Sequence, residues 1–195
     1  MMLSISIRKI FFILLIVIGI PSCIPAVFMA GAAAAGVVIY DQRSPKIMFD
    51  DKNIIFTVQN ALNNDSELRN KSHVTIIVFN HIALLVGQTP TVELRNRAET
   101  LVKANTKIKI LYNELTVEQP ISDVARAGDT WLTTKVKTSL LAAPGLNSAS
   151  LKVITENGVV YLLGLTTRTQ AQIATAKTRT VAGVKKVVKL FEYIN

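Results

Sequence analysis

The sequence predicts an α+β protein built from two tandem copies of one αββαβ unit. The first reason is an internal repeat, in which "HIALLVGQTPTVELRNRAETLV" aligns with "GVVYLLGLTTRTQAQIATAKTR" and Gly87 falls on Gly164. Upstream of it, "DKNIIFTVQNAL" aligns with "DTWLTTKVKTSL", so that Asp51 falls on Asp129. The third reason is that each copy continues into two β-rich runs joined by a short polar turn. The repeat therefore indicates two domains of the same kind.

Each copy begins with a helix, because apolar residues recur every four positions and so line one side of it. These residues are Ile54, Val58 and Leu62 in the first copy, and Leu132, Val136 and Leu140 in the second. Asp51 and Asp129 are expected near the helix starts, where a carboxylate caps free N–H groups and faces the positive end of the helix dipole.

A β-hairpin follows each helix. In the second copy, Asn157-Gly158 separates "LKVIT" from "VVYLLGL" and is a strong signal for a two-residue turn, because both turn positions need a positive φ. The first copy has Asn80-His81 between "HVTIIVF" and "IALLVG". Histidine is less comfortable in such a turn, which leaves the geometry of the first hairpin open.

A second helix and a last strand complete each copy. The helices are expected over about 92–104 and 169–181, and the strands are "IKILYNELTV" and "VKKVVKLFEYI". Gly87 and Gly164 end hydrophobic strands without a glycine-rich turn or a Lys-Ser/Thr pair, so they do not indicate a phosphate loop. They are expected to allow close backbone approach where strand passes to helix.

The N-terminal residues have the order of a secretory signal. Arg8 and Lys9 precede an apolar run over 10–20, which is shorter than the ~20 residues of a comfortable membrane span. The stretch "IPSC" that follows resembles a bacterial lipobox, in which cleavage occurs just before a cysteine whose thiol carries diacylglycerol. We therefore expect a signal peptide over 1–22 and lipid attachment at Cys23.

The alternative is an uncut membrane anchor, but Pro21 and Pro25 would then lie inside the spanning helix. Cys23 is the only cysteine, so no internal disulfide is available and acylation would remove an exposed thiol. In the lipoproteins that this pattern resembles, aspartate after the cysteine favours inner-membrane retention, whereas Ile24 stands here. The periplasmic leaflet of the outer membrane is the expected location.

Residues 23–47 are expected to form a lipidated, Gly/Ala-rich tether, with a small-residue membrane helix as the alternative. The net charge of +9 includes two positive charges in the signal peptide, and the remainder still favours an anionic surface. Such a surface is phosphatidylglycerol, lipopolysaccharide or nucleic acid, and export argues against nucleic acid.

The segment "GVVYLLG" and the closing "GVKKV" resemble the BON domain. The first copy keeps Leu84, Val86 and Gly87 but lacks glycine at His81 and Lys107. Two BON domains behind a lipobox resemble the DolP (YraP) family of outer-membrane lipoproteins, which is related to the soluble periplasmic protein OsmY. The stretches "DQRSP", "YNEL", "QPIS" and "TENGVVYLLGL" add to the resemblance, which covers essentially the whole mature chain.

This resemblance implies a three-stranded mixed sheet in each domain, with two helices covering one face. We place BON domain 1 at 48–118, a linker at 119–127 and BON domain 2 at 128–195. The resemblance also implies partners: an anionic phospholipid membrane, and outer-membrane assembly or cell-division-site proteins.

No catalytic constellation is visible, and neither a metal nor a cofactor is expected. His73 and His81 are the only histidines, and no cysteine or obvious carboxylate pair near them completes a metal site or a triad. We interpret them as solvated or loosely packed residues at strand ends, and Asp50 and Asp51 as helix caps. The chain is therefore not expected to be an enzyme.

One helix carries a candidate site. If the apolar residues of "DTWLTTKVKTSLL" face the core, six others point to the side or away from it: Trp131, Thr134, Lys135, Thr138, Leu141 and Ala142. Tryptophan suits a membrane interface, Lys135 suits a lipid phosphate and Leu141 suits insertion. The resemblance adds that DolP-like proteins bind anionic phospholipid through this helix. The alternative is that Trp131 packs between the two domains or caps a sheet edge.

The leading interpretation is a non-enzymatic lipoprotein that binds anionic phospholipid through BON domain 2 and supports outer-membrane integrity. A protein-interaction module, acting on envelope assembly or stress machinery through BON domain 1, is the alternative. A lectin or peptidoglycan binder comes third, and an aromatic content of 6% weakens it.

Overall fold

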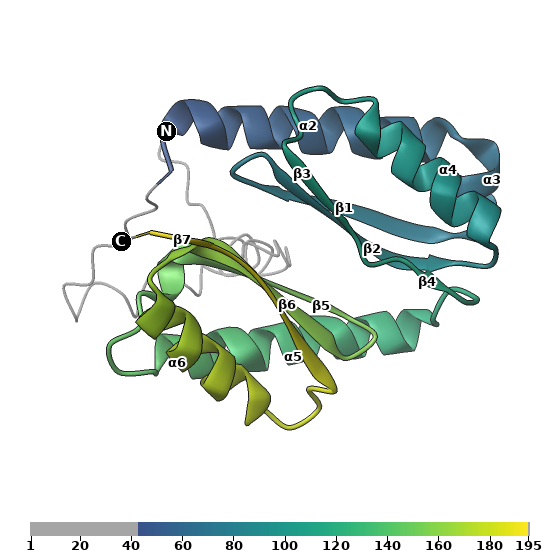
Figure 1. Cartoon of the computed structure of the whole chain (residues 1–195). Coiled ribbons are helices and arrows are strands. Elements are labelled where there is room, and N and C mark those ends of the chain that lie inside the picture. The colour runs from purple at the N-terminus through teal and green to yellow at the C-terminus, as the bar shows by residue number, and fades with distance from the viewer. Residues whose placement is uncertain (1–42, 195) are drawn as a thin grey trace, which may run out of the picture. The chain divides into compact units, whose positions relative to one another are not determined.

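The computed structural model describes residues 43–194, which belong to one compact unit over residues 40–195. They form two successive αββαβ domains, as predicted (Figure 1). The expected signal peptide, Cys23 and most of the expected tether lie outside the described residues. Within residues 43–194, no helix has both the length and the apolar character needed to cross a bilayer.

Within the described residues, the first domain consists of α2 (Pro45–Asn64), α3 (Ser66–Lys71), β1 (His73–Phe79), β2 (Ile82–Thr89), α4 (Val92–Lys103), β3 (Ile110–Asn113) and β4 (Thr116–Val117). β1 pairs antiparallel with β2, whereas β3 and β4 pair parallel with β2. β3 and β4 are two parts of the predicted last strand, which is interrupted where Leu115 turns into the core. α2 and α4 cover one face of this sheet (Figure 1).

The second domain has the same order without the extra helix after its first one. It consists of α5 (Asp123–Leu141), a short 3₁₀ helix η2 (Ser148–Ser150), β5 (Leu151–Glu156), β6 (Val159–Thr166), α6 (Arg168–Arg179) and β7 (Lys186–Tyr193). β5 and β6 are antiparallel, and β7, reached through the α6 crossover, runs parallel to β6. α5 and α6 cover one face of this sheet (Figure 1).

The first helices begin earlier than predicted. α2 begins at Pro45, where Ser44 Oγ accepts a hydrogen bond from Ile47 N, and α5 begins after Ser122, whose Oγ accepts one from Ala125 N. Serine before proline or aspartate is a strong helix start, but the apolar spacing begins more than a turn later. Both helices therefore extend into the segments expected as tether and linker.

In each domain, one cluster of buried side chains joins the pair of helices to the sheet. The predicted apolar residues of α2 and α5 all lie in these clusters and are nearly inaccessible to solvent, which confirms the predicted helix faces. In the strands, alternate residues such as Val78 and Leu85 in the first domain, and Val153 and Leu162 in the second, complete these cores.

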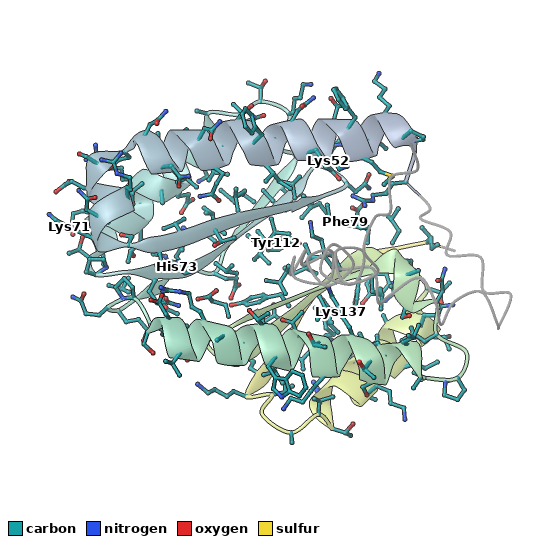
Figure 2. The ribbon with its side chains drawn as sticks, turned by 180° about the vertical axis from the view of Figure 1, so that it is seen from behind. Lys52, Lys71, His73, Phe79, Tyr112 and Lys137 are labelled. Atoms are coloured by element: carbon teal, nitrogen blue, oxygen red, sulfur yellow. The ribbon has the colours of Figure 1, made fainter. Side chains whose placement is uncertain are left out.

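The opposite faces of the two sheets share a third cluster, which we call the shared cluster. It contains Ile77, Phe79, Leu84, Val86, Tyr161, Leu163 and Leu190, with Tyr112 packed against it. Figure 2 shows Phe79 and Tyr112 on the face of the first sheet that α2 does not cover. Each sheet is therefore covered on one face by helices and on the other by the shared cluster. The sides of the helices that point away from the sheets stay uncovered.

Both hairpins turn at the predicted residues. Asn80 and His81 have φ values of 53° and 65°, and Asn157 and Gly158 have values of 48° and 76°, so His81 adopts the same left-handed conformation as Gly158. The two glycines at the strand ends approach the facing strand rather than a helix. A Cβ on Gly87 would lie 1.9 Å from the carbonyl oxygen of His73.

The carboxylates expected to cap the first helices serve the hairpins instead. Asp51 accepts hydrogen bonds from the backbone N–H groups of Asn80 and His81 at 2.7 and 2.9 Å. Asp129 accepts them from Asn157 and Gly158 at 2.7 and 2.8 Å. The capping prediction was therefore wrong, because both aspartates lie well inside a helix that begins earlier.

Candidate functional site

α5 has a buried side and an exposed side. Leu132, Val136 and Leu140 face β5, β6 and α6, so the opposite side of the helix faces away from the protein. The side chains of Trp131 and Leu141 are 65% and 67% exposed. Thr134, Thr138 and Ala142 are exposed as well. These five predicted residues therefore share one accessible surface.

Lys135, the sixth predicted residue, lies at the edge of this surface. It is half-buried, and its Nζ donates a hydrogen bond to the carbonyl oxygen of Ala182 at 2.7 Å. Ala182 belongs to the turn between α6 and β7. The ammonium group is thus held beside the turn, and an anion that approached it would share it with that carbonyl.

Sequence reasoning missed one residue of this surface. Val124 is 82% exposed and lies seven residues, or about two helical turns, before Trp131, which places both on the same side of α5. Gly128, between them, has no neighbouring atom within 4 Å of the place where a Cβ would be. The Ser122-Asp123 helix start was the signal that would have revealed Val124. We call Val124, Trp131, Thr134, Thr138, Leu141 and Ala142 the outer face of α5.

The alternative role for Trp131 is not supported by the structure. The contact between the two sheets is made by strand residues of the shared cluster, on the side of the second sheet opposite α5. Trp131 is not part of that cluster and remains largely exposed. It therefore neither packs between the domains nor covers a sheet edge.

The second domain carries an excess of positive charge. Residues 119–195 include ten basic and four acidic residues, whereas residues 43–118 include ten and eight. The four carboxylates already have partners: Asp123 pairs with Arg126, Asp129 holds the hairpin turn, Glu156 accepts from Gln88, and Glu192 accepts from Asn80. In the described part of this domain, only Arg126 forms an ion pair with a carboxylate. The remaining cations favour an anionic surface.

The equivalent helix of the first domain also has exposed aromatic residues, which sequence reasoning did not single out. Phe49 and Phe56 on α2 are 65% and 69% exposed and lie seven residues apart. Their neighbours on this side of the helix are polar, namely Lys46, Asn53 and Asn60, so the apolar surface is not continuous. Several basic residues of this domain are ion-paired, including Arg97 with Asp65 and Lys107 with Asp50.

His73 lies at the start of β1, as expected, whereas His81 differs from the expectation. His81 lies beside two carboxylates: its backbone N–H donates to Asp51, and its Nε2 is 3.9 Å from Asp50 Oδ2. Asp50 already pairs with Lys107, whose hydrogen bond lowers the pKa of this carboxyl, and Asp51 pairs with Arg43 at 2.8 Å. Among residues 43–194, no group of three or more His, Cys, Asp and Glu side chains is arranged to hold a metal ion.

Two small cavities lie in the first domain and not at α5. One, of about 250 Å³, is lined by residues of α3 and α4 including Glu67 and Arg97. The other, of about 270 Å³, lies between α2, α3 and β1 and is lined by Gln59, Arg69 and Ser72 among others. Both are smaller than the clefts that usually hold a small-molecule ligand. The outer face of α5 is therefore the stronger candidate site, and it is a surface rather than a pocket.

The BON domain family matches the chain twice, over residues 50–119 and 128–195. The chain is 36% identical over 188 residues to the outer membrane lipoprotein DolP of Haemophilus influenzae, covering 96% of this chain and 97% of that protein. It is 33% identical over 154 residues to a 21 kDa hemolysin of Actinobacillus pleuropneumoniae, covering 79% of each. Among solved structures, CdsD of the Chlamydia trachomatis type III secretion system aligns over 74% of this chain and 63% of that chain. Its identity of 13% and TM-score of 0.30 are too low to carry an argument.

Proposed function

Because the chain belongs to the DolP family of outer-membrane lipoproteins with two BON domains, we propose that it binds anionic phospholipid through the outer face of α5. In this proposal, a lipid on Cys23 holds the protein in the periplasmic leaflet of the outer membrane, and the bound protein supports membrane integrity without catalysis. The observation that carries the proposal is one continuous exposed surface with Val124, Trp131 and Leu141, in a domain with unpaired positive charge.

Apolar side chains supply the first part of the binding free energy. Trp131 and Leu141 contribute roughly 1.5 to 3 kcal/mol each when fully inserted, and partial insertion gives less. Tryptophan is favoured at the bilayer interface because its ring meets acyl carbons while its N–H stays near water. Basic residues that reach an anionic surface add about 1 kcal/mol each. These contributions together suit a helix that lies in the plane of the membrane surface.

The lipid on Cys23 and the outer face of α5 would act together. The lipid on Cys23 keeps the chain at the membrane, and a second contact on the same chain then acts at high effective concentration. α5 therefore needs only a weak intrinsic affinity, and its charge provides selectivity for anionic head groups.

Binding to vesicles tests the lipid contact. A fragment over residues 40–195, which contains all three buried clusters, is mixed with phosphatidylglycerol or phosphatidylcholine vesicles and sedimented. We expect binding to phosphatidylglycerol that weakens as salt is raised, because salt screens the charge attraction and spares the apolar contact. Equal binding to both lipids, or to neither, would overturn the proposal.

Mass spectrometry tests the anchor separately. Membrane-extracted protein should begin at a lipidated Cys23, and Cys23→Ala should either release the folded part or leave it held by an uncut signal. An intact N-terminus at Met1 would rule the anchor out.

Phe49 and Phe56 favour a second candidate function, a protein contact made by the first domain. An amphipathic helix can dock into a groove of a partner through apolar residues spaced in this way. Outer-membrane assembly or cell-division-site proteins are the proposed partners. Loss of such a contact after Phe56→Glu, with lipid binding unchanged, would separate it from the role of α5.

A further inference from the structure

The turn between α6 and β7, over residues 180–185, packs directly against α5. Lys135 donates to the carbonyl of Ala182, and a Cβ on Gly183 would lie 3.5 Å from a methyl group of Leu132 and 3.6 Å from Lys135 Nζ. Gly183 has a φ of 103°, a conformation that favours glycine. The turn is therefore built to lie close beside the outer face of α5, on the side where Lys135 projects.

Apolar packing and backbone hydrogen bonds hold the turn in place. Val181 and Val184 pack on the core beneath α5, and Val184 N donates to the carbonyl of Val181 at 3.1 Å. Lys185 N donates to the carbonyl of Gly158 at 2.9 Å, which joins the turn to the tip of the hairpin. Two of its exposed residues, Ala182 and Gly183, have almost no side chain, so a ligand can approach the backbone there closely.

Basic side chains surround this turn. Arg179, at the end of α6, and Lys185, the last residue of the turn, are both exposed. Within the described residues neither of the two forms an ion pair with a carboxylate, and Lys185 Nζ donates instead to Asn157 Oδ1 at 3.0 Å. Together with Lys135 they give three cations at the turn beside the outer face of α5.

We propose that Lys135, Arg179 and Lys185 bind the phosphate groups of anionic lipids whose acyl chains meet the outer face of α5. This inference rests on the proposed function and adds to Lys135 of α5 the basic residues of the turn beside it as head-group contacts. The arrangement is complementary to a bilayer, because apolar side chains on the helix lie next to cations that match the anionic head groups. Lysine suits a diffuse layer of phosphates because its charge is compact and its stem is flexible.

A charge-matched pair of variants tests the inference. The turn variant carries Arg179→Gln and Lys185→Gln, and the control carries Lys46→Gln and Lys52→Gln, which remove the same charge from exposed sites of the first domain. Binding to phosphatidylglycerol vesicles should weaken about fivefold for each charge removed from the turn, and by less than threefold in all for the control. The salt dependence of binding should also flatten in the turn variant only.

Further arms separate the possible outcomes. Melting temperatures of both variants should stay near that of the unchanged protein, and Lys185→Arg should retain binding. Equal losses in the turn variant and the control would overturn the inference, while loss of binding in Trp131→Glu would still support the role of α5. Inorganic phosphate that displaced the vesicles at constant ionic strength would show a site for soluble anions and would also overturn it.

Discussion

Asp51 and Asp129 have the same task in the two domains. Each carboxylate lies on the first helix and accepts two backbone hydrogen bonds from the hairpin turn, where the N–H groups point inward. In the first domain Arg43 also pairs with Asp51. Hydrogen bonds to a charged acceptor are worth roughly 1.5 to 3 kcal/mol each, so these residues fasten the helix to the hairpin.

Removing this carboxylate is expected to destabilise the second domain. Asp129→Ala should lower the free energy of unfolding by about 2 to 4 kcal/mol, because two N–H groups lose their acceptor. Urea denaturation measures the change. Asp123→Ala is the control, because Asp123 is exposed and pairs only with Arg126. A loss for Asp129→Ala no larger than for the control would contradict this role.

Ionisation of Tyr161, in the shared cluster, makes the stability of the folded protein depend on pH in the alkaline range. Burial, followed by the nearby charges of Glu114 and Glu156, raises the pKa of Tyr161 to about 12 from an ordinary value of 10.0. The folded protein therefore keeps the proton more tightly than the unfolded chain. Its contribution to stability is complete below about pH 10 and is lost as the pH rises toward 12.

This effect is measured by comparing Tyr161→Phe with the unchanged protein. Between pH 10 and 12, the free energy of unfolding should fall less steeply for Tyr161→Phe, because phenylalanine has no proton to lose. Lysine titration contributes equally to both proteins and cancels in the comparison. Identical pH slopes would show that Tyr161 ionises as freely in the folded state as in the unfolded state.

At the residue scale, local spacing was enough to predict which side of α5 is exposed. Trp131 and Leu141 follow from the positions of Leu132, Val136 and Leu140 and from the 100° turn per residue. The partners of Asp51 and Asp129 could not be predicted in this way. Each hydrogen bond joins a helix to a hairpin almost thirty residues away, and only the tertiary structure brings them together.

At the scale of elements, α2 and α5 each consist of two parts. The later turns carry the predicted apolar residues, whereas the first turns extend beyond the spacing that revealed the helix. The sequence signal for those turns is a serine cap, which is weaker than a repeated apolar pattern. In α5, this early part carries Val124 and lengthens the exposed surface.

The length of the binding surface can be tested at Val124. Val124→Glu should weaken binding to phosphatidylglycerol vesicles by about tenfold, because it places a charge where an apolar side chain meets the bilayer. The helix should remain intact, since a carboxylate in the first turn favours the positive end of the dipole. Val117→Glu, at an exposed site in β4, is the matched control. Unchanged binding would mean that the contact begins only at Trp131.

At the scale of the whole molecule, the shared cluster makes the two domains depend on each other. A domain of roughly 70 residues buries only about three fifths of its unfolded surface, so each BON domain alone has a thin core. The shared cluster covers a second face of both sheets, and hydrogen bonds such as Gln88 to Glu156 at 2.8 Å add to it. Whether the two copies would dock could not be read from the repeat, because strand alternation shows an apolar face but not its partner.

Coupling between the domains should be visible by hydrogen exchange. Leu84, in the shared cluster, is fully buried, and Leu84→Ala should cost about 2 to 5 kcal/mol of stability. Amide exchange should accelerate in β6 as well as in β2, because Leu163 and Tyr161 lose a packing partner. Faster exchange limited to the first domain would show that the two domains unfold independently.

The central claim is that the outer face of α5 binds anionic phospholipid, and Trp131→Glu tests it most directly. Phe56→Glu is the matched control, because Phe56 is an aromatic residue of similar exposure on the first helix of the other domain. Trp131→Glu should lower binding to phosphatidylglycerol vesicles at least about tenfold, while its circular dichroism spectrum and melting temperature stay nearly unchanged. Phe56→Glu should bind almost as well as the unchanged protein. Equal losses in both variants, or unfolding of Trp131→Glu, would contradict the assignment of lipid binding to α5.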